Sequence, residues 1–329
     1  MRKYRSSSIL LAVTLLAAAL FAEAQQPTKI YRIGYLTERT ETSERDRYAA
    51  FKKGLQDLGY VEGKNLVIEL RRGPVGQPEK IRALAADLVR INVDVIVASG
   101  GSTTRVAKEM TTTLPIVFTI SADPVGAGLV ANLASPGANV TGLSDLHSAL
   151  VPKRLELLKE VAPTASRVGV LLNGNWATHS RQLKEVQAAA PAFGITILPL
   201  PITGRDDIDP AFAAMQKEGA QGLIVLGDPL TGSHRQTIAD LAIKNQLPTV
   251  FTNPRSVAAG GLMSYGANIP DLWFRAATFV DKILKGRKPA DLPVEQPMRF
   301  VFAINLKTAA QIGVTIPPNV LVRATRIIK

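Results

Sequence analysis

Small polar side chains follow several short apolar runs that have the pattern of β-strands. In the first half of the chain the residues at such run ends that suit ligand binding are Thr37, Glu38, Gly101, Ser102, Thr103, Ser121 and Asp123. In the second half they are Asn173, Asn175, Asp228 and Asn253, with the ring of Tyr265 as a stacking wall. Open parallel sheets bind ligands beyond the carboxyl ends of their strands. We therefore expect these residues to line a ligand-binding site.

The loop of residues 100–104, with the sequence GGSTT, is the most specific candidate for ligand binding. Glycines let the backbone approach a ligand closely, and the free N–H groups at a helix start attract anions. Ser102 or Thr103 would be the N-cap, and an ordinary strand-to-helix turn is the alternative interpretation. The loop is not a P-loop, because no G-K-[ST] follows, and it lacks the G-x-G-x-x-G dinucleotide fingerprint.

Asp228 is the candidate partner for an ammonium group, because a carboxylate in a closed cleft needs a countercharge. The alternative is that it caps a turn or helix before Pro229, and Asp123 before Pro124 has the same two interpretations. If the ligand resembles an amino acid, its carboxylate is expected at residues 101–103. Its ammonium group is then expected at Asp228, on the facing side. Trp176 and Tyr35 are further candidate stacking walls.

Other kinds of site are disfavoured by composition. The chain of 329 residues has no cysteine, which excludes disulfides, thiolate metal sites and a cysteine nucleophile. Its three histidines, at 147, 179 and 234, lie too far apart for a histidine metal motif. No Ser-His-Asp order or paired-acid spacing is readable, although a triad assembled in space stays open. We expect no metal and no cofactor.

The first residues have the pattern of a secretory signal peptide. Arg2, Lys3 and Arg5 precede an apolar run at 9–22, which is shorter than the roughly 20 residues that span a bilayer. The sequence AEA at 22–24 then fits a cleavage site, so we expect cleavage after Ala24 and a periplasmic protein. A buried or anchoring N-terminal helix is the alternative.

The chain has a formal net charge of +12. Removal of the leader, which carries three basic residues and one acidic residue, leaves +10. The lysines and arginines are scattered, so we expect solvated helix faces and no nucleic-acid partner. Docking to an acidic partner or an anionic ligand stays open.

Strand and helix patterns alternate along the rest of the chain. Strand-like runs lie at 30–36, 66–70, 93–98, 116–120 and 140–143, with helical periodicity between them. The series restarts at 167–172 and continues with runs at 196–198, 223–226 and 249–251. Such βαβ series indicate parallel sheets with right-handed crossovers.

The two halves of the chain also share short similar sequence segments. IGYL at 33–36 aligns with VGVL at 168–171, Gly59 aligns with Gly194, and LPIVFT at 114–119 aligns with LPTVFT at 247–252. These matches lie at nearly one offset, which indicates two similarly folded lobes. A strand at 261–265, a helix at 271–285, a strand at 300–304, a short helix at 306–312 and a strand-like stretch at 319–328 follow.

These trailing elements predict that the chain crosses back between the lobes. The fold class expected is α/β, with two Rossmann-like lobes of parallel sheets that are joined by a hinge of several crossovers around a cleft. We expect residues 28–146 and 257–287 in the first lobe. Residues 147–256 and 288–329 are then expected in the second.

Several longer motifs carry a family resemblance across nearly the whole mature chain. They are IGYL at 33–36, FKKGL at 51–55, LGY at 58–60, IVF at 116–118, DPVGAGLV at 123–130, NVTG at 139–142, GGLMSYG at 260–266 and INLKTA at 304–309. The chain resembles the substrate-binding proteins of bacterial ABC importers, of the periplasmic binding protein type I fold. Within these it is similar to the branch that includes tryptophan- and tyrosine-binding proteins. This family commonly has Thr-Pro where this chain has Gly101-Ser102.

The resemblance implies a function without catalysis. The protein would capture a small amino-acid-like or aromatic carboxylate ligand between its lobes, as a monomer, and deliver it to an ABC permease in the inner membrane. Lobe closure about a hinge would trap the solute. A sensor subunit that docks on a receptor and an exported enzyme that uses the cleft are the alternatives.

Overall fold

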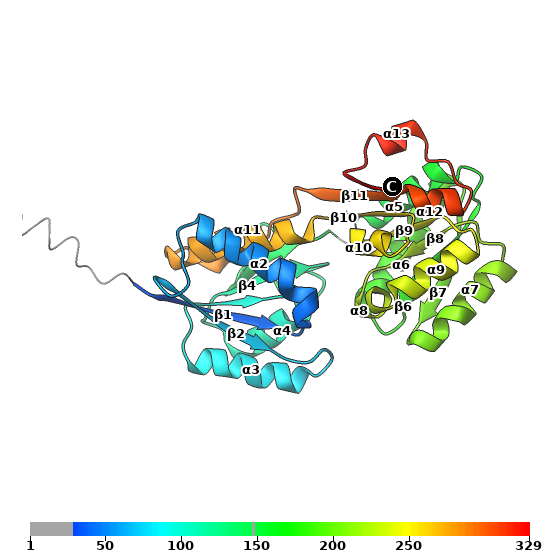
Figure 1. Cartoon of the computed structure of the whole chain (residues 1–329). Helices are drawn as coiled ribbons and strands as arrows, with labels where there is room; N and C mark the ends of the chain where they lie inside the picture. Colours follow the sequence, from blue (N-terminus) through cyan, green and yellow to red (C-terminus); the bar gives the residue numbers. More distant parts are fainter. Residues whose placement is uncertain (1–28, 147–148) are drawn as a thin grey trace, which may run out of the picture.

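The computed structural model describes residues 29–146 and 149–329, which form two α/β lobes (Figure 1). The first lobe contains the strands β1 (Tyr31–Thr37), β2 (Leu66–Arg72), β3 (Val95–Ala98), β4 (Ile116–Ser121) and β5 (Val140–Ser144). They pair in the order β2-β1-β3-β4-β5, and every pairing is parallel. This is the order of a doubly wound sheet of the flavodoxin type, in which all strands end at the same edge.

The second lobe repeats that order and extends it. Its strands are β6 (Arg167–Asn173), β7 (Thr196–Ile202), β8 (Leu223–Val225), β9 (Thr249–Phe251), β10 (Met263–Ala267), β11 (Phe300–Asn305) and β12 (Arg326–Ile328). The sheet order is β12-β11-β10-β9-β8-β6-β7, so β7-β6-β8-β9-β10 reproduces the topology of the first lobe. Strand β11 is antiparallel to β10, and β12 runs parallel to β11.

Helices cover both faces of the first sheet. They are α2 (Glu41–Asp57), α3 (Pro78–Arg90), α4 (Gly101–Met110), α11 (Ile269–Leu284) and the short 3₁₀ helix η3 (Pro289–Asp291). Strand β1 sends Ile33 and Tyr35 into the core under α2 and α11, and Leu36 into the core under α3 and α4. A strand that is buried on both faces has apolar residues at successive positions, which explains the continuous apolar runs in the sequence.

The second sheet is covered in the same way. Its helices are α5 (Val151–Val161), α6 (Ala177–Ala189), η1 (Ala190–Phe193), η2 (Arg205–Asp207), α7 (Ile208–Lys217), α8 (Pro229–Ser233), α9 (Arg235–Lys244), α10 (Pro254–Ala258), α12 (Leu306–Gln311) and α13 (Pro318–Leu321). Residues of α5 and α6 build one core, and those of α7 and α9 build the other. The aligned glycines Gly59 and Gly194 follow the helical segment that comes after the first strand of each lobe, with φ of 89° and 63°.

The chain passes between the lobes three times, after β5, between β10 and α11, and between η3 and β11 (Figure 1). The predicted lobe boundaries are wrong at two places. Residues 257–267 belong to the second lobe, because β10 pairs with β9 and β11. Residues 288–295 belong to the first, because Thr141 Oγ1 donates to the carbonyl of Leu292 at 2.6 Å and Glu295 bridges Leu143.

The strand-like stretch predicted at 319–328 is also wrong in its first part, where Pro318–Leu321 forms α13 and only Arg326–Ile328 is a strand. The predicted signal peptide and its cleavage site lie outside the described residues, as does His147. In the two described ranges, none of the helices combines the length and the apolar character that crossing a bilayer requires.

Candidate functional site

The carboxyl ends of the two sheets face each other, and two ion pairs join them. Arg255 of α10, which follows β9, has its Nη2 2.8 Å from Oδ2 of Asp46 in α2, which follows β1. Arg181 of α6, which follows β6, pairs with Asp123 in the loop after β4. Both pairs connect a segment after a strand in one lobe with a segment after a strand in the other. The predicted site residues therefore belong to edges that oppose each other.

In the first lobe, Thr37 ends β1 and is fully buried, and its Oγ1 accepts a hydrogen bond from Ser99 Oγ at 2.7 Å. Helix α4 starts at Gly101 with Gly100 as its N-cap, at φ 155° and without a side-chain cap. The expectation of Ser102 or Thr103 as N-cap is wrong. Thr103 and Thr104 turn their hydroxyls back to the carbonyl of Gly100, at 3.0 and 2.6 Å. The first N–H groups of α4 thus lack any side-chain acceptor from a cap residue.

Two charged residues flank this helix start. Glu38 accepts a hydrogen bond from the hydroxyl of Ser102. Arg39, which is not among the predicted site residues, donates from its backbone N–H to Thr37 Oγ1 at 3.1 Å and from Nε to the carbonyl of Ser99 at 3.3 Å. One of many scattered arginines, Arg39 is distinguished in the sequence only by its place directly after Glu38.

The strand-end residues after β4 play mixed roles. Ser121 is 6% exposed and lies at an irregularity in the pairing of β4 with β5. Asp123 Oδ1 accepts from the backbone N–H of Gly126 at 2.9 Å, while its Oδ2 pairs with Arg181. Asp123 therefore holds its own turn and also links the lobes, so both of its oxygens have partners.

In the second lobe, the structure brings Asn173 and Asp228 into direct contact. The Nδ2 of Asn173 donates to Asp228 Oδ2. Asp228 is also the N-cap of α8, since its Oδ1 accepts from the backbone N–H and from the hydroxyl of Thr231, each at 2.8 Å. The capping interpretation of Asp228 is thus correct, and its carboxylate already accepts three hydrogen bonds.

The remaining residues of this edge are more open. Asn175 is exposed, and its backbone N–H donates to Asn173 Oδ1 at 2.9 Å. Asn253 caps α10 by accepting from the backbone N–H of Arg255 at 3.0 Å. Trp176 is 40% exposed just before α6, and it is the candidate stacking wall that remains available to a ligand.

The two tyrosines proposed as walls lie elsewhere. The ring of Tyr265 stacks on Phe300 at a centroid distance of 5.8 Å, within the second lobe at the crossover strands. Its carbonyl accepts from Nε of the fully buried Arg154 at 2.9 Å, and burial lowers the pKa of Arg154 to about 10. Tyr35 is fully buried in the first core, so it cannot be a wall. Periodicity alone gave no sign of either packing partner.

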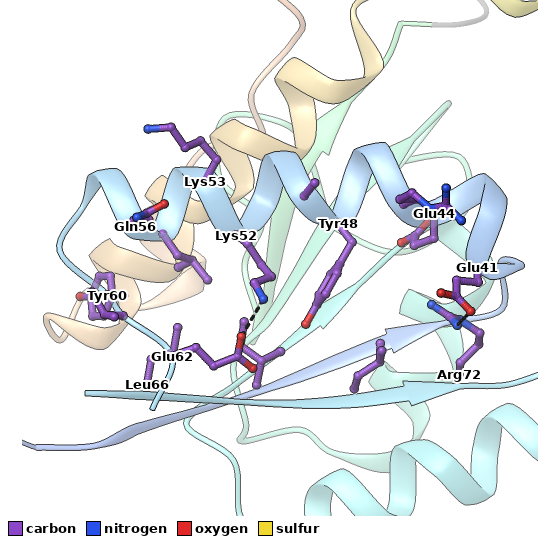
Figure 2. Close-up of a pocket in the computed structure, with 16 residues that line it drawn as sticks. Glu41, Glu44, Tyr48, Lys52, Lys53, Gln56, Tyr60, Glu62, Leu66 and Arg72 are labelled. Atoms are coloured by element: carbon purple, nitrogen blue, oxygen red, sulfur yellow. Dashed lines mark ion pairs between the residues drawn. The ribbon is translucent and has the colours of Figure 1, made fainter. Parts of the chain in front are cut away.

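A hollow of about 740 Å³ lies between α2 and β2 on the first lobe (Figure 2). Its apolar floor comes from Tyr48 and β2, and it contains none of the residues predicted at the strand ends. Several of its charged groups neutralise one another. Lys52 lies 2.7 Å from Glu62, and Arg72 lies 3.9 Å from Glu41. The facing strand ends, with their open helix start, remain the better candidate site.

Within residues 29–146 and 149–329, no group of three or more histidine, aspartate or glutamate side chains is placed to hold a metal ion. The facing edges offer hydrogen-bonding groups, charged side chains and an exposed ring.

The family model described as "ABC transporter substrate binding protein" matches residues 41–328. The chain belongs to this family. The resemblance stated from the sequence is thereby confirmed. An ABC transporter substrate-binding protein captures a small-molecule solute and works with a membrane permease, so these two predicted partners are confirmed at the level of the family.

Individual relatives match over most of the chain. A curated tyrosine-binding protein of Clostridioides difficile (strain R20291) is 29% identical over 244 residues, which are 74% of this chain and 70% of the relative. A solved conserved domain protein of Vibrio cholerae is 30% identical, with a TM-score of 0.82 over 91% of this chain and all of that one. A domain from Streptococcus pneumonia, solved in complex with L-Trp, is 27% identical with the same TM-score and coverage. These structures confirm the predicted fold class of this substrate-binding protein.

Proposed function

We propose that this chain is the exported, periplasmic binding component of an ABC importer for an aromatic amino acid, tyrosine or tryptophan. The observation that carries the proposal is the likeness to a tyrosine-binding protein over 74% of the chain, and to a structure with bound L-Trp over 91% of it. The facing strand ends add chemistry that suits a zwitterion with a ring. They offer an uncapped helix start in one lobe, and a carboxylate and an exposed indole in the other.

In this proposal the ligand's carboxylate lies at the N–H groups of residues 101–103. Partial positive charge at a helix start favours an anion by about 0.3–1 kcal/mol, and by up to roughly 2 kcal/mol when partly buried. The ammonium group faces Asp228, which Asn173 already holds in place. The ring lies against Trp176. The other proposed contacts are Thr37, Glu38, Ser121, Asp123, Asn175 and Asn253. Tyr265 is left out, because its ring stacks on Phe300 within the second lobe.

The proposal includes the remaining properties expected from the sequence. The protein acts as a monomer, without catalysis, cofactor or nucleic acid, and a signal peptidase removes residues 1–24. Mass spectrometry of the periplasmic protein is expected to find Gln25 at the N-terminus. An intact Met1 chain in the cytoplasm would contradict export and leave the ligand assignment to be judged separately.

A ligand screen tests the central claim. The mature protein is heated with L-Tyr, L-Trp, L-Phe, L-Leu and L-Ala in parallel, and each complex that raises Tm is then measured by calorimetry. A ligand present at 100 times its Kd stabilises the folded state by about 2.7 kcal/mol, which gives a clear rise in Tm. Binding of L-Leu alone, or of none of the five, would refute the aromatic ligand class.

A further inference from the structure

Arg39 is held over the start of α4 by contacts on one side of its guanidinium group. Its Nε donates to the carbonyl of Ser99 and lies 3.7 Å from Oε2 of Glu44. Its Nη2 is the heavy atom nearest to the position that a Cβ at Gly100 would take, at 3.9 Å. The guanidinium group therefore lies where β1 and β3 end and where the N–H groups of α4 begin.

The other side of the guanidinium group is unused. In the described part of the chain, no protein acceptor is within hydrogen-bond distance of Nη1 or Nη2 of Arg39, and its side chain is 31% exposed. A guanidinium fork with both terminal nitrogens free matches the two oxygens of a carboxylate. Its anchoring through Nε reduces the rotamer freedom that such a contact would have to remove.

A buried chain of hydrogen bonds stands behind this arrangement. Glu44 is 1% exposed, and its Oε1 accepts from the hydroxyl of Tyr35 at 2.5 Å. That hydroxyl in turn accepts from Nε1 of Trp273 at 2.8 Å. Burial, and then the nearby Glu44, raise the pKa of Tyr35 well above its usual value, so the hydroxyl stays a donor.

The second oxygen of Glu44 is turned to the cation. Across the described residues, Oε2 of Glu44 has no hydrogen-bond partner, and Arg39 is the cation paired with it. A buried carboxylate needs such a partner charge, so Glu44 restricts where the guanidinium group can lie. Tyr35 and Trp273 fix the carboxylate, and the carboxylate fixes Arg39.

A second arginine adds positive charge at the same place. Arg47 lies 5.3 Å from the ring centroid of Trp273, and its Nη1 donates to the carbonyl of Ser43 at 2.8 Å. Burial first, and then the charge of Arg39, lower the pKa of Arg47 to about 9. Repulsion between the two guanidinium groups would be relieved by an anion bound at Arg39.

We propose that Arg39 binds the carboxylate of the ligand, together with the N–H groups of residues 101–103, and that Glu44 is its positioning residue. This assignment rests on the proposed function, since it requires a ligand with a carboxylate at this edge. Arg39 adds a positive charge to the contact between the ligand's carboxylate and the start of α4, which the N–H groups alone would make weakly. It also makes the first lobe the main source of discrimination between an amino acid and its uncharged derivatives.

Calorimetry on the mature protein tests the assignment with L-Trp and L-tryptophanamide, which keeps the ring and the ammonium group but lacks the carboxylate. The variants are Arg39→Gln and Arg39→Lys, with Arg45→Gln as control, because Arg45 is an exposed arginine on α2, shortly after Arg39 in the chain. Arg39→Gln is expected to weaken L-Trp binding about 30-fold or more, as for loss of one partner of a desolvated charge pair. The Kd of the amide should stay within about threefold, and Arg45→Gln should change neither.

The other variants separate positioning from folding. Arg39→Lys keeps the charge but not the fork, so its loss should be smaller than that of Arg39→Gln. Glu44→Gln should lower the ratio of the amide Kd to the L-Trp Kd, an effect that a merely destabilised fold would not produce. Unchanged L-Trp affinity in Arg39→Gln, or equal losses for L-Trp and the amide, would overturn the assignment while the proposed function stood. A wild-type protein that bound no aromatic amino acid would overturn both.

Discussion

Arg255 in the second lobe and Asp46 in the first form an ion pair of 2.8 Å across the space between the lobes. Their side chains are 45% and 66% exposed, and an exposed pair of this kind contributes about 0–1 kcal/mol. Arg181 and Asp123 form a second interlobe pair. These two links can hold one spacing of the lobes without preventing another, as the lobe closure expected from the sequence would require.

Removal of the first link should broaden the range of lobe separations. Asp46→Asn deletes one charge of the pair, and Asp57→Asn is the control, because Asp57 pairs with Lys53 inside α2. The chain has no native cysteine, so one label can be attached to an introduced cysteine in each lobe. Double electron–electron resonance between two such spin labels should give a wider distance distribution for Asp46→Asn than for the unsubstituted chain at low salt. The difference between the two distributions should shrink as salt screens the ion pair. Identical distributions would mean that the pair does not restrain the lobes.

The two roles of Asp228 can be separated by the choice of substitution. Asp228→Ala removes the cap of α8 and should cost about 0.5–2 kcal/mol of stability. Asp228→Asn keeps an equally good cap but removes the charge. If Asp228 faces the ligand's ammonium group, the Asn variant should lose about 30-fold or more in affinity with little change in Tm. Full affinity in Asp228→Asn would leave this residue with its capping role alone.

Trp273 should contribute strongly to the stability of the first lobe. Trp273→Phe leaves the buried hydroxyl of Tyr35 without its donor and should cost about 1–3 kcal/mol in urea unfolding. Trp176→Phe, at an exposed site, should change stability by less than about 0.5 kcal/mol. Trp273→Phe leaves Trp176, in the second lobe, as its one tryptophan, so the unfolding of both variants is followed by far-UV circular dichroism, which reports on both lobes. Equal stability of the two variants would contradict the role of the Trp273–Tyr35 hydrogen bond.

Alkaline pH should weaken the first lobe through its tyrosines. Burial, and then Glu62, raise the pKa of Tyr48 from 10.0 to about 12. Between these values the unfolded chain has lost the proton and the folded chain keeps it, so this contribution to stability is full below pH 10 and declines as the pH rises toward 12. Unfolding at several pH values should show this decline, and Tyr48→Phe should flatten it. Part of the slope should remain, because the pKa values of Tyr35 and Tyr60 are raised too. An unchanged slope in Tyr48→Phe would show that Tyr48 does not contribute.

The central strands were predictable because they are buried on both faces, which leaves an apolar run in the sequence. The run at 249–251 coincides with β9, and that at 116–120 falls one residue short of β4. The lobe to which a late element belongs was less predictable. Strand β10 and helix α11 adjoin in sequence, yet one joins the second sheet and the other packs on α2. Local periodicity shows that a helix has an apolar face but does not identify the surface that it covers.

The positions of the candidate site residues were predictable, but their packing partners were not. Strand ends could be located, and Asn173 and Asp228 do meet there. The capping geometry could not be chosen, because Gly100, Ser102 and Thr103 all suit a helix start. Arg39 was missed because its importance depends on Glu44, and Glu44 depends on Trp273, which is more than 200 positions away in the chain.

Because α11 returns to the first lobe, the first lobe cannot finish folding until α11 has been synthesised. The first lobe has all its strands once residue 144 is made, but Trp273 and the rest of α11 are then still unsynthesised. At about 5–20 residues per second, a ribosome needs roughly 7–28 s to reach the end of α11. During this interval the face of the sheet under α11 lacks its cover. The first lobe therefore cannot finish folding early in synthesis, a delay that suits the export we propose, in which the chain crosses a membrane before it folds.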